Sequence, residues 1–458
     1  MKNKIVSFNK QKKESLALKI LSVITSSTLF YLSHTGGVLA ESQKEDLPPS
    51  TLSPNTLEIP TSDPIIPNLP ENPENLTPLQ QQQVKETLEK LDLEALGYSQ
   101  LGNPLKALQL WHQEWMLSRY LGTVTEIQTL SRLAPIFWDQ NQKIEVQLIR
   151  QRLQTIFTES LSKNPVNLEH LQLLASAFQQ TRSKADAVTV YQKIIELAHE
   201  KEDILTEGKA LKILGNIHLK WLSYEKAAVV YEDLARLIQE NREVFLTAYL
   251  EFQSQPPATP APSGNSPITQ TNTPAPEAPP TEEETLKNLV YVYDQSGKSL
   301  QAIASLEKLI AFYTNLQNVK PIPSLKSAIA SHYQALGKRN LASQYYQESY
   351  TLAIGIQQFA IASEALEKLA NLYSSQKQWE AALKIYQMQL TINQQSYNLY
   401  GTMSSYDKIG QMYVQMKEDK KALNAFQEGL QIANQLGHGQ EIFTQKITKI
   451  NRRLKGDM

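Results

Sequence analysis

The chain has 458 residues, which is too long for one compact core and predicts two or more structural units. Hydrophobic residues make up 41% and charged residues 20% of the sequence, an ordinary balance for a folded protein. The formal net charge is −1, so composition does not predict a nucleic-acid or anionic-membrane surface. The absence of cysteine excludes disulfides, thiolate metal ligands, a cysteine nucleophile and a lipidated cysteine.

The first forty residues have the layout of a secretory signal peptide. Five lysines lie within the first 13 residues, an apolar run extends from Ile20 to Leu32, and Val38-Leu39-Ala40 suits cleavage before Glu41. The run is 13 residues long, which is short for a membrane span. We expect export to a periplasm or an equivalent extracytoplasmic compartment, with an uncleaved membrane anchor as the alternative. Cleavage would remove six lysines and one glutamate and leave a net charge of −6.

Proline marks the expected joints between segments. Of the 23 prolines, nine lie between Pro48 and Pro78 and nine between Pro256 and Pro280. Both stretches are rich in Ser, Thr and Asn, so they cannot bury enough apolar surface to offset their ordering entropy. We therefore expect this order of segments: a signal peptide or anchor at 1–40, a disordered linker at 41–80, repeats at 81–254, a disordered insert at 255–282, and repeats with a final cap at 283–455.

The two folded segments contain a repeating pattern of small and aromatic residues. A small residue lies twelve positions before a marker alanine, an aromatic residue usually nine positions before it, and a second aromatic residue four positions after it. Successive markers are forty residues apart from 187 to 227 and along 302, 342, 382 and 422. A degenerate copy is expected around Trp138, between the markers at 107 and 187. The clearest copies are Ala107 with Trp111, Ala187 with Tyr191, Ala227 with Tyr231, Ala342 with Tyr346, Ala382 with Tyr386, and Ala422 with Phe426.

This pattern resembles the tetratricopeptide repeat, in which small–x₂–aromatic is followed by alanine–x₃–aromatic. Ala370-Asn371-Leu372-Tyr373 followed by Ala382 and Tyr386 illustrates it, and the resemblance covers residues 85–455. The resemblance implies an all-α superhelix, a solenoid of antiparallel helix pairs. The family's usual period is about 34 residues, so a period of forty predicts longer helices or longer turns.

A final amphipathic segment follows the last repeat. The apolar stripe lies opposite a polar side that carries Lys446, Lys449, Arg452 and Arg453. A solenoid needs its last pair covered, so we interpret the segment as a capping helix, with a partner-binding helix as the alternative. The predicted stripe consists of Ile442, Phe443, Ile447, Ile450 and Leu454.

Nothing in the sequence forms a catalytic constellation. Gly297-Lys298-Ser299 has the end of a phosphate-binding loop but lacks the glycine five residues earlier, so we interpret it as a tight turn. The seven histidines form no pair at i and i+4 with an acidic neighbour, as a zinc site of that kind would require. No nucleophile elbow surrounds a serine. We predict a protein that is not an enzyme and that uses no metal and no cofactor.

The resemblance implies that the first helix of each pair lines a concave groove. The residues expected there are polar, mixed in sign and rich in amides and hydroxyls, which suits an extended peptide or a partner's helix. The candidate groove residues are Lys209, Lys212, Asn216, Lys287, Asn288, Tyr291, Asp294, Ser327, Ser331, Gln334, Glu367, Asn371, Asp407 and Gln411.

Three of these candidates, Lys212, Asn216 and Asn288, match places that tetratricopeptide adaptors use to clamp a peptide's terminal carboxylate. The two remaining places fall on Ser324 and Ala328, where the family has basic residues. Two missing cations remove most of the attraction for a carboxylate, so we favour ordinary solvated residues over a working clamp.

We predict a scaffold or assembly factor outside the cytoplasm that holds a protein or peptide partner in this groove. The alternative is a structural spacer or self-associating component of a cell-envelope complex. No nucleic-acid partner is expected, and a membrane is expected only through an uncleaved N-terminal segment. Whether the insert lets the two repeat segments flex or loops out from one continuous superhelix stays open.

Overall fold

The structure, a computed structural model, describes residues 66, 69–70, 75–163, 165–255 and 278–456. All regular structure in these ranges is helical, and no helix there is both long and apolar enough to cross a bilayer. The predicted signal peptide, most of the predicted linker and most of the predicted insert lie outside the described residues. The chain divides into two units between Thr285 and Leu286, which we call the N-terminal block and the C-terminal block.

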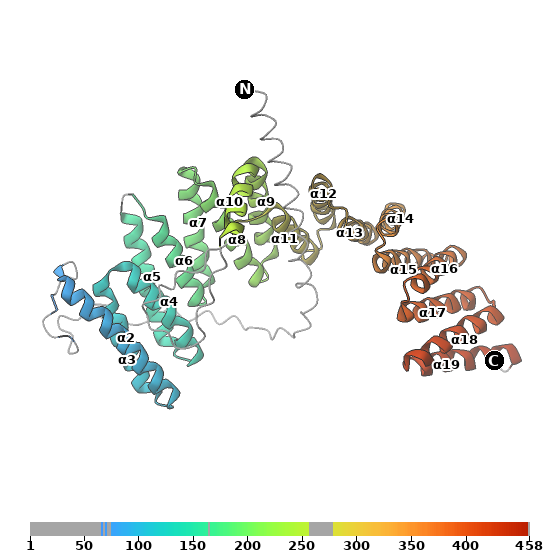
Figure 1. The fold of residues 1–458 in the computed structure, drawn as a ribbon, viewed down its shortest axis with the longest axis horizontal. Coiled ribbons are helices and arrows are strands. Elements are labelled where there is room, and N and C mark those ends of the chain that lie inside the picture. The colour runs from blue at the N-terminus through green and yellow to red at the C-terminus, as the bar shows by residue number, and fades with distance from the viewer. Residues whose placement is uncertain (1–65, 67–68, 71–74, 164, 256–277, 457–458) are drawn as a thin grey trace, which may run out of the picture. The chain divides into compact units, whose positions relative to one another are not determined.

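The described part of the N-terminal block contains four helix pairs and an additional helix, α10, that contacts α8 and α9 (Figure 1). The first of these helices begins at Pro78, three residues before the predicted start, behind a capping box formed by Thr77 and Gln80. The helices are α2 (Pro78–Gln100), α3 (Pro104–Ser118), the 3-10 turn η3 (Arg119–Leu121), α4 (Thr123–Asp139), α5 (Lys143–Ser162), α6 (Leu168–Gln180), α7 (Lys184–Glu200), α8 (Ile204–Lys220), α9 (Tyr224–Glu240) and α10 (Arg242–Ser254).

In the C-terminal block, each helix that begins after Gln295 packs against the next one in the chain. The block boundary falls within α11 (Glu282–Gln295). The helices that follow are α12 (Ser299–Asn315), α13 (Ile322–Ala335), α14 (Arg339–Gly355), α15 (Phe359–Ser375), α16 (Trp379–Gln395), α17 (Leu399–Gln415), α18 (Asp419–Leu436) and α19 (Gln440–Lys455). The predicted fold class, an all-α solenoid of helix pairs, is confirmed.

Long helices, rather than long turns, produce the period of forty. Helices α14, α15, α16 and α17 are each 17 residues long and are joined by three-residue connections. Helix α13 has only 14 residues, because its start is set by Pro321 and Pro323, but the connection before it is longer by the same amount. The repeat that contains α13 therefore keeps its length of forty residues although the helix itself is shorter.

The middle residue of the three-residue connections is in the left-handed conformation, except between α18 and α19, where Gly437 and Gly439 take this conformation on either side of His438. Glycine takes this role at Gly297 and Gly337, with φ of 66° and 71°. Elsewhere an ordinary residue does, as at Gln357, Lys377 and Tyr397, with φ of 59°, 60° and 55°. This backbone costs a residue with a side chain about 1 kcal/mol, so neighbouring helices must hold these turns in place.

The small and aromatic residues of the repeat meet as predicted. The marker alanines and the aromatic residues that follow them are buried in both blocks. Gly215 lies against the ring of Tyr231, and Gly410 against the ring of Phe426, so closely that a Cβ at either glycine would lie less than 3 Å from the ring atoms. The position twelve residues before the marker alanine therefore requires a small residue, because the aromatic side chain of the second helix lies directly over it.

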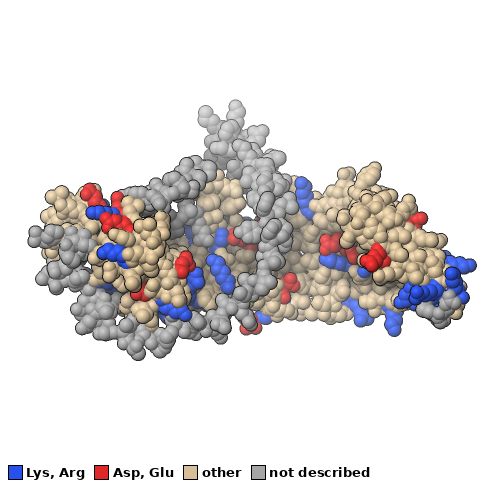
Figure 2. Space-filling view, turned by 90° about the horizontal axis from the view of Figure 1, so that it is seen from below, with Lys and Arg blue, Asp and Glu red and all other residues tan. Residues whose placement is uncertain are grey.

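Helix α19 covers α18, as expected of a cap. Phe443 and Ile450 are buried against α18, but Ile442 and Leu454 are 55% and 42% exposed. The predicted stripe was therefore too wide, because only one narrow line of the helix faces the last repeat. In Figure 2, Lys and Arg atoms gather at the end of the molecule that carries this helix.

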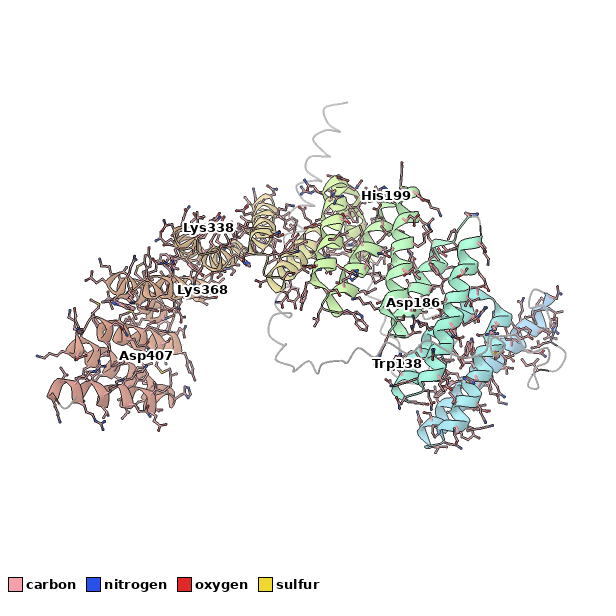
Figure 3. All side chains as sticks on the ribbon, turned by 180° about the vertical axis from the view of Figure 1, so that it is seen from behind. Trp138, Asp186, His199, Lys338, Lys368 and Asp407 are labelled. Atoms are coloured by element: carbon pink, nitrogen blue, oxygen red, sulfur yellow. The ribbon has the colours of Figure 1, made fainter. Side chains whose placement is uncertain are left out.

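The degenerate repeat is held by polar contacts of its tryptophan. Trp138, at the end of α4, donates from Nε1 to the carbonyl of Thr181 at 3.1 Å (Figure 3). The guanidinium of Arg182 lies 5.1 Å from the centre of the same ring. A tryptophan can thus link this atypical repeat to the next one.

Two ion clusters lie inside the N-terminal block. In one, Glu126 accepts from Arg119 Nε at 3.1 Å and from Arg152 Nε at 2.7 Å. In the other, Arg132 pairs with Asp92 at 2.7 Å and with Glu114. Burial raises the pKa of Glu114 to about 7, with a smaller contribution from Asp92, although Arg132 acts in the opposite direction. Because this pKa exceeds that of an unfolded glutamate, folding favours the protonated form.

We predict that Glu114 weakens the N-terminal block as pH rises through 7. The stabilising contribution of its bound proton is complete below the unfolded pKa and is lost above the folded pKa. Between pH 5.5 and 8, the unfolding free energy of wild type should fall by about 2 kcal/mol more than that of Glu114→Gln. Guanidinium unfolding followed by tryptophan fluorescence measures this, since Trp111, Trp115, Trp138 and Trp221 all lie in this block.

Glu94→Gln is the matched control, because Glu94 is an exposed carboxylate on α2. It should leave the pH dependence of wild type unchanged. If the unfolding free energies of wild type and Glu114→Gln changed equally with pH, the assignment of this proton to Glu114 would be contradicted.

Candidate partner-binding surface

The candidate groove residues all lie on the first helices of helix pairs. Within each helix they are spaced by one, three or four residues, and the spacings of three and four place them on one helical face. We call this set the inner-face row. Its members lie on α8 (Lys209, Lys212, Asn216), α11 (Lys287, Asn288, Tyr291, Asp294), α13 (Ser327, Ser331, Gln334), α15 (Glu367, Asn371) and α17 (Asp407, Gln411).

A hydrogen bond between the paired helices recurs along this row. The Tyr231 hydroxyl donates to Asn216 Oδ1 at 2.8 Å, and the Tyr386 hydroxyl donates to Asn371 Oδ1 at 2.6 Å. Burial raises the pKa of Tyr386 to about 12, so its hydroxyl keeps its proton and remains a donor. In the pair α13 and α14, the hydroxyls of Ser331 and Tyr346 are 3.1 Å apart, whereas the pair α11 and α12 has Leu306 at the aromatic position.

These contacts correct one premise of the sequence analysis. We expected the polar side chains of the inner-face row to face a partner, but Asn216, Ser331 and Asn371 each bind a buried tyrosine of their own repeat. A sequence signal for this was present: a tyrosine occupies the second-helix aromatic position fifteen residues after each of them. Where that position holds Phe426 instead, the residue fifteen earlier is Gln411.

The lysine on which a carboxylate clamp would depend, Lys212, is neither free for a ligand nor solvated, although the sequence analysis favoured ordinary solvated residues over such a clamp. Lys212 is 11% exposed in its side chain, and its Nζ lies 3.0 Å from a carboxylate oxygen of Glu284. Asn216 already accepts from Tyr231. Asn288 lies beyond the block boundary, in the C-terminal block. The chain therefore supplies its own carboxylate to the lysine on which the clamp would depend.

The C-terminal block presents the more accessible part of the row. Tyr291, Asp294, Gln334 and Asn371 are exposed, and Tyr291 is 50% exposed. Ser327 is buried and does not belong to the accessible surface. Lys287 is also exposed, while Asn288, Ser331, Glu367, Asp407 and Gln411 are half-buried, as is Lys209 in the N-terminal block.

The row ends in a polar cluster beside the capping helix. Asp407 on α17, labelled in Figure 3, accepts from Gln411 Nε2 at 2.7 Å and pairs with Lys446 of α19. The sequence analysis placed Lys446 on the polar side of the cap and Asp407 in the groove without connecting the two. Their contact shows that α19 closes the C-terminal end of the inner-face row.

Among the described residues, no group of three or more His, Asp or Glu side chains is placed to hold a metal ion. Gly297 and Lys298 lie in the connection between α11 and α12, with Gly297 left-handed and Lys298 at the helix N-cap, and Ser299 is the first residue of α12. The structure confirms that this segment is a tight turn between two helices.

Comparison with known families identifies the repeat. A tetratricopeptide repeat model matches residues 361–435, which run from α15 into α18. Residues 361–435 of the chain therefore consist of tetratricopeptide repeats. Tetratricopeptide repeats are a solenoid architecture whose extended surfaces bind other proteins. No curated protein matches the sequence of this chain.

Solved structures of several helical repeat proteins are similar to the chain at low identity. BtubC (BKLC) from P. vanneervenii is 15% identical over 56% of this chain and 92% of its own, with a TM-score of 0.34. A putative kinesin light chain from Podosopora anserina is 11% identical over 50% of this chain and 97% of its own, with a TM-score of 0.33. The apo form of RapI is 9% identical over 82% of this chain and 99% of its own, with a TM-score of 0.35. All three TM-scores lie below 0.5, so these likenesses carry no argument about function.

We predict that Asn371 and Tyr386 stabilise the repeat as a pair. Asn371→Ala leaves the Tyr386 hydroxyl without its acceptor, and Tyr386→Phe removes the donor. A double-mutant cycle on the unfolding free energy should therefore give a coupling energy of about 1 kcal/mol. Denaturant unfolding of the full chain, followed by circular dichroism, measures the four variants of the cycle.

The matched control is the pair Gln394 and Tyr406 in the same block, whose polar atoms are 3.5 Å apart at an exposed site. Gln394→Ala and Tyr406→Phe should give additive effects. A cycle through Asn371 and Tyr386 that is equally additive would show that the recurrent bond does not hold the helix pair together.

Proposed function

We propose that the protein is a non-catalytic scaffold or assembly factor that binds a protein or peptide partner along the inner-face row. The observation that carries this proposal is the repetition of polar side chains at one register on α13, α15 and α17. Helices α13 and α15 contact each other directly, so polar groups on one helix continue onto the next. A continuous row of this kind suits an extended peptide or a partner's helix.

The recurrent hydrogen bond from a tyrosine hydroxyl to an asparagine orients donor groups along the row for a partner. Because a tyrosine hydroxyl donates to the carbonyl oxygen of Asn216 and of Asn371, each amide NH₂ is left as the available donor group. Neither NH₂ group has a hydrogen-bond partner among the described residues. A fixed donor loses little conformational freedom on binding, and this favours affinity for carbonyl groups of a partner.

We place this activity outside the cytoplasm on the strength of residues 1–40, which have the order of a basic leader, an apolar run and a cleavage site. The absence of cysteine suits an oxidising compartment. The partner in this proposal is therefore an exported or envelope protein.

The test is crosslinking in intact cells, followed by affinity recovery of the full-length protein. The inner-face variant carries Gln334→Arg and Glu367→Arg, on α13 and α15. The matched control carries Gln347→Arg and Glu428→Arg, which make the same changes at exposed positions on the second helices α14 and α18. Both variants add the same charge, so a difference between them reports on the location of the surface.

We expect defined partners with wild type and with the control, and their loss with the inner-face variant. If both variants recover the same partners as wild type, the inner-face row is not the binding surface. Recovery of only the protein itself would instead support a structural spacer or self-associating component.

A further inference from the structure

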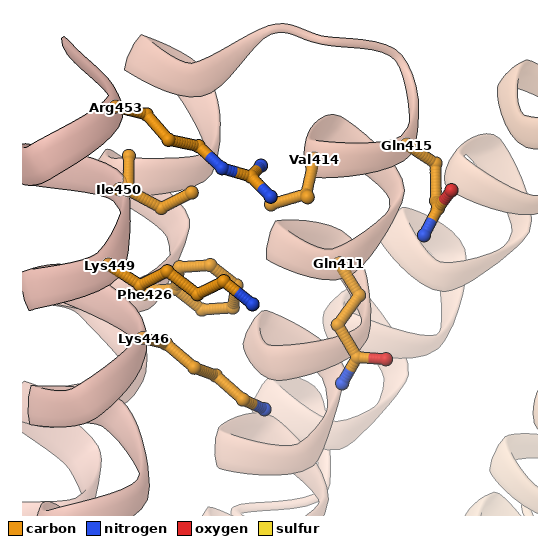
Figure 4. A pocket seen from close by; sticks show the side chains of 8 residues that line it. All are labelled: Gln411, Val414, Gln415, Phe426, Lys446, Lys449, Ile450 and Arg453. Carbon is orange, nitrogen blue, oxygen red and sulfur yellow. The ribbon is translucent and has the colours of Figure 1, made fainter. Parts of the chain in front are cut away.

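A small pocket lies where α17, α18 and α19 meet (Figure 4). Its volume is about 200 Å³, which is smaller than typical small-molecule sites and comparable to the space for one side chain. Three of the lining residues are cations and none is a carboxylate. The lining consists of Gln411, Val414 and Gln415 from α17, Phe426 from α18, and Lys446, Lys449, Ile450 and Arg453 from α19.

The pocket has an apolar floor and a cationic side. Phe426 and Ile450 are almost fully buried and form the floor together with Val414. The side chains of Lys449 and Arg453 extend from α19 toward α17, across from Gln411 (Figure 4). An apolar group could therefore rest on the floor while its polar neighbours reach the cations and the amide.

One of the three cations at the pocket, Lys449, has no carboxylate partner among the described residues. Lys446 pairs with Asp407, and Arg453 lies 3.8 Å from Asp419. Lys449 is exposed and has no ion pair or hydrogen bond among the described residues. Helix α19 as a whole carries five Lys and Arg residues and one Glu. The excess positive charge remains in an otherwise nearly neutral chain.

Capping alone does not account for this arrangement. Phe443 and Ile450 cover the last repeat, and that task needs only an apolar line along α19. It does not require cations that extend over a hollow between α19 and α17. The sequence analysis set a capping helix against a partner-binding helix, and the structure is compatible with both roles in one helix.

We propose that this pocket binds an acidic peptide segment, with one apolar side chain on the floor and carboxylates against Lys449 and Arg453. This inference rests on the proposed function, since it names the chemistry of the partner at the C-terminal end of the inner-face row. Charge complementarity selects an anionic ligand. The recessed apolar floor selects a peptide side chain, because the flat surface of a bilayer would contact protruding cations and leave the floor empty.

The test is fluorescence anisotropy of the full chain with a fluorescein-labelled polyglutamate peptide that carries one central phenylalanine. Lys449→Glu should weaken binding about tenfold, because a charge-assisted contact is replaced by repulsion. Lys308→Glu is the matched control, since Lys308 is an exposed lysine on α12 in the same block, and it should bind as wild type does. Lys449→Ala, with a smaller loss, separates lost attraction from added repulsion, and circular dichroism verifies that each variant is folded.

Three outcomes would overturn the inference. The first is no binding of the acidic peptide, or equal binding by wild type and Lys449→Glu. The second is equal affinity for a polyglutamate peptide without phenylalanine, which would show that the apolar floor does not contribute to binding. The third is preferred binding to vesicles of phosphatidylcholine and phosphatidylglycerol or to single-stranded DNA. If any of these occurs while the inner-face variant still loses its partners, the proposed function stands and only this inference fails.

Discussion

The structure depends on one backbone constraint: a three-residue connection whose middle residue is left-handed, as at Gln357, Lys377 and Tyr397. Such a turn reverses the chain within a fixed length, and between 17-residue helices it gives a period of forty. Because the period is constant, the same face of each first helix returns at the same register. A row of polar side chains can continue along the block only under this condition.

Contacts between the first and second helices of a pair fix the orientation of polar side chains along this row. A buried tyrosine fixes the carbonyl of Asn216 or Asn371 and leaves the amide NH₂ as a donor. The same side chain therefore stabilises the repeat and keeps an amide donor on the face that we propose as the binding surface. At the end of the row the tyrosine is replaced by Phe426, which becomes the floor of a pocket, and α19 supplies cations instead of amides. The chemistry of the surface thus changes from neutral donors to positive charge toward the C-terminus.

The sequence predicted the helix pairs, the repeat frame and the capping helix, because these follow from small and aromatic residues at fixed spacing. It could not separate long helices from long turns, since both lengthen the period equally. The apolar stripe predicted on α19 was too wide, because the spacing of apolar residues does not show that the last repeat leaves Ile442 and Leu454 exposed. The pairing of Lys212 with Glu284 and of Asp407 with Lys446 joins residues far apart in sequence, and no local pattern indicates such contacts.

The central claim is that partners are held on the inner face of the first helices. The most direct measurement places a photo-crosslinking amino acid at Gln334 or at Gln347, one on each helix of the same pair, and irradiates intact cells. The account predicts a covalent adduct of defined mass from position 334 and none from position 347, with the partner identified by mass spectrometry. Adducts from 347 alone, or equally from both positions, would contradict it.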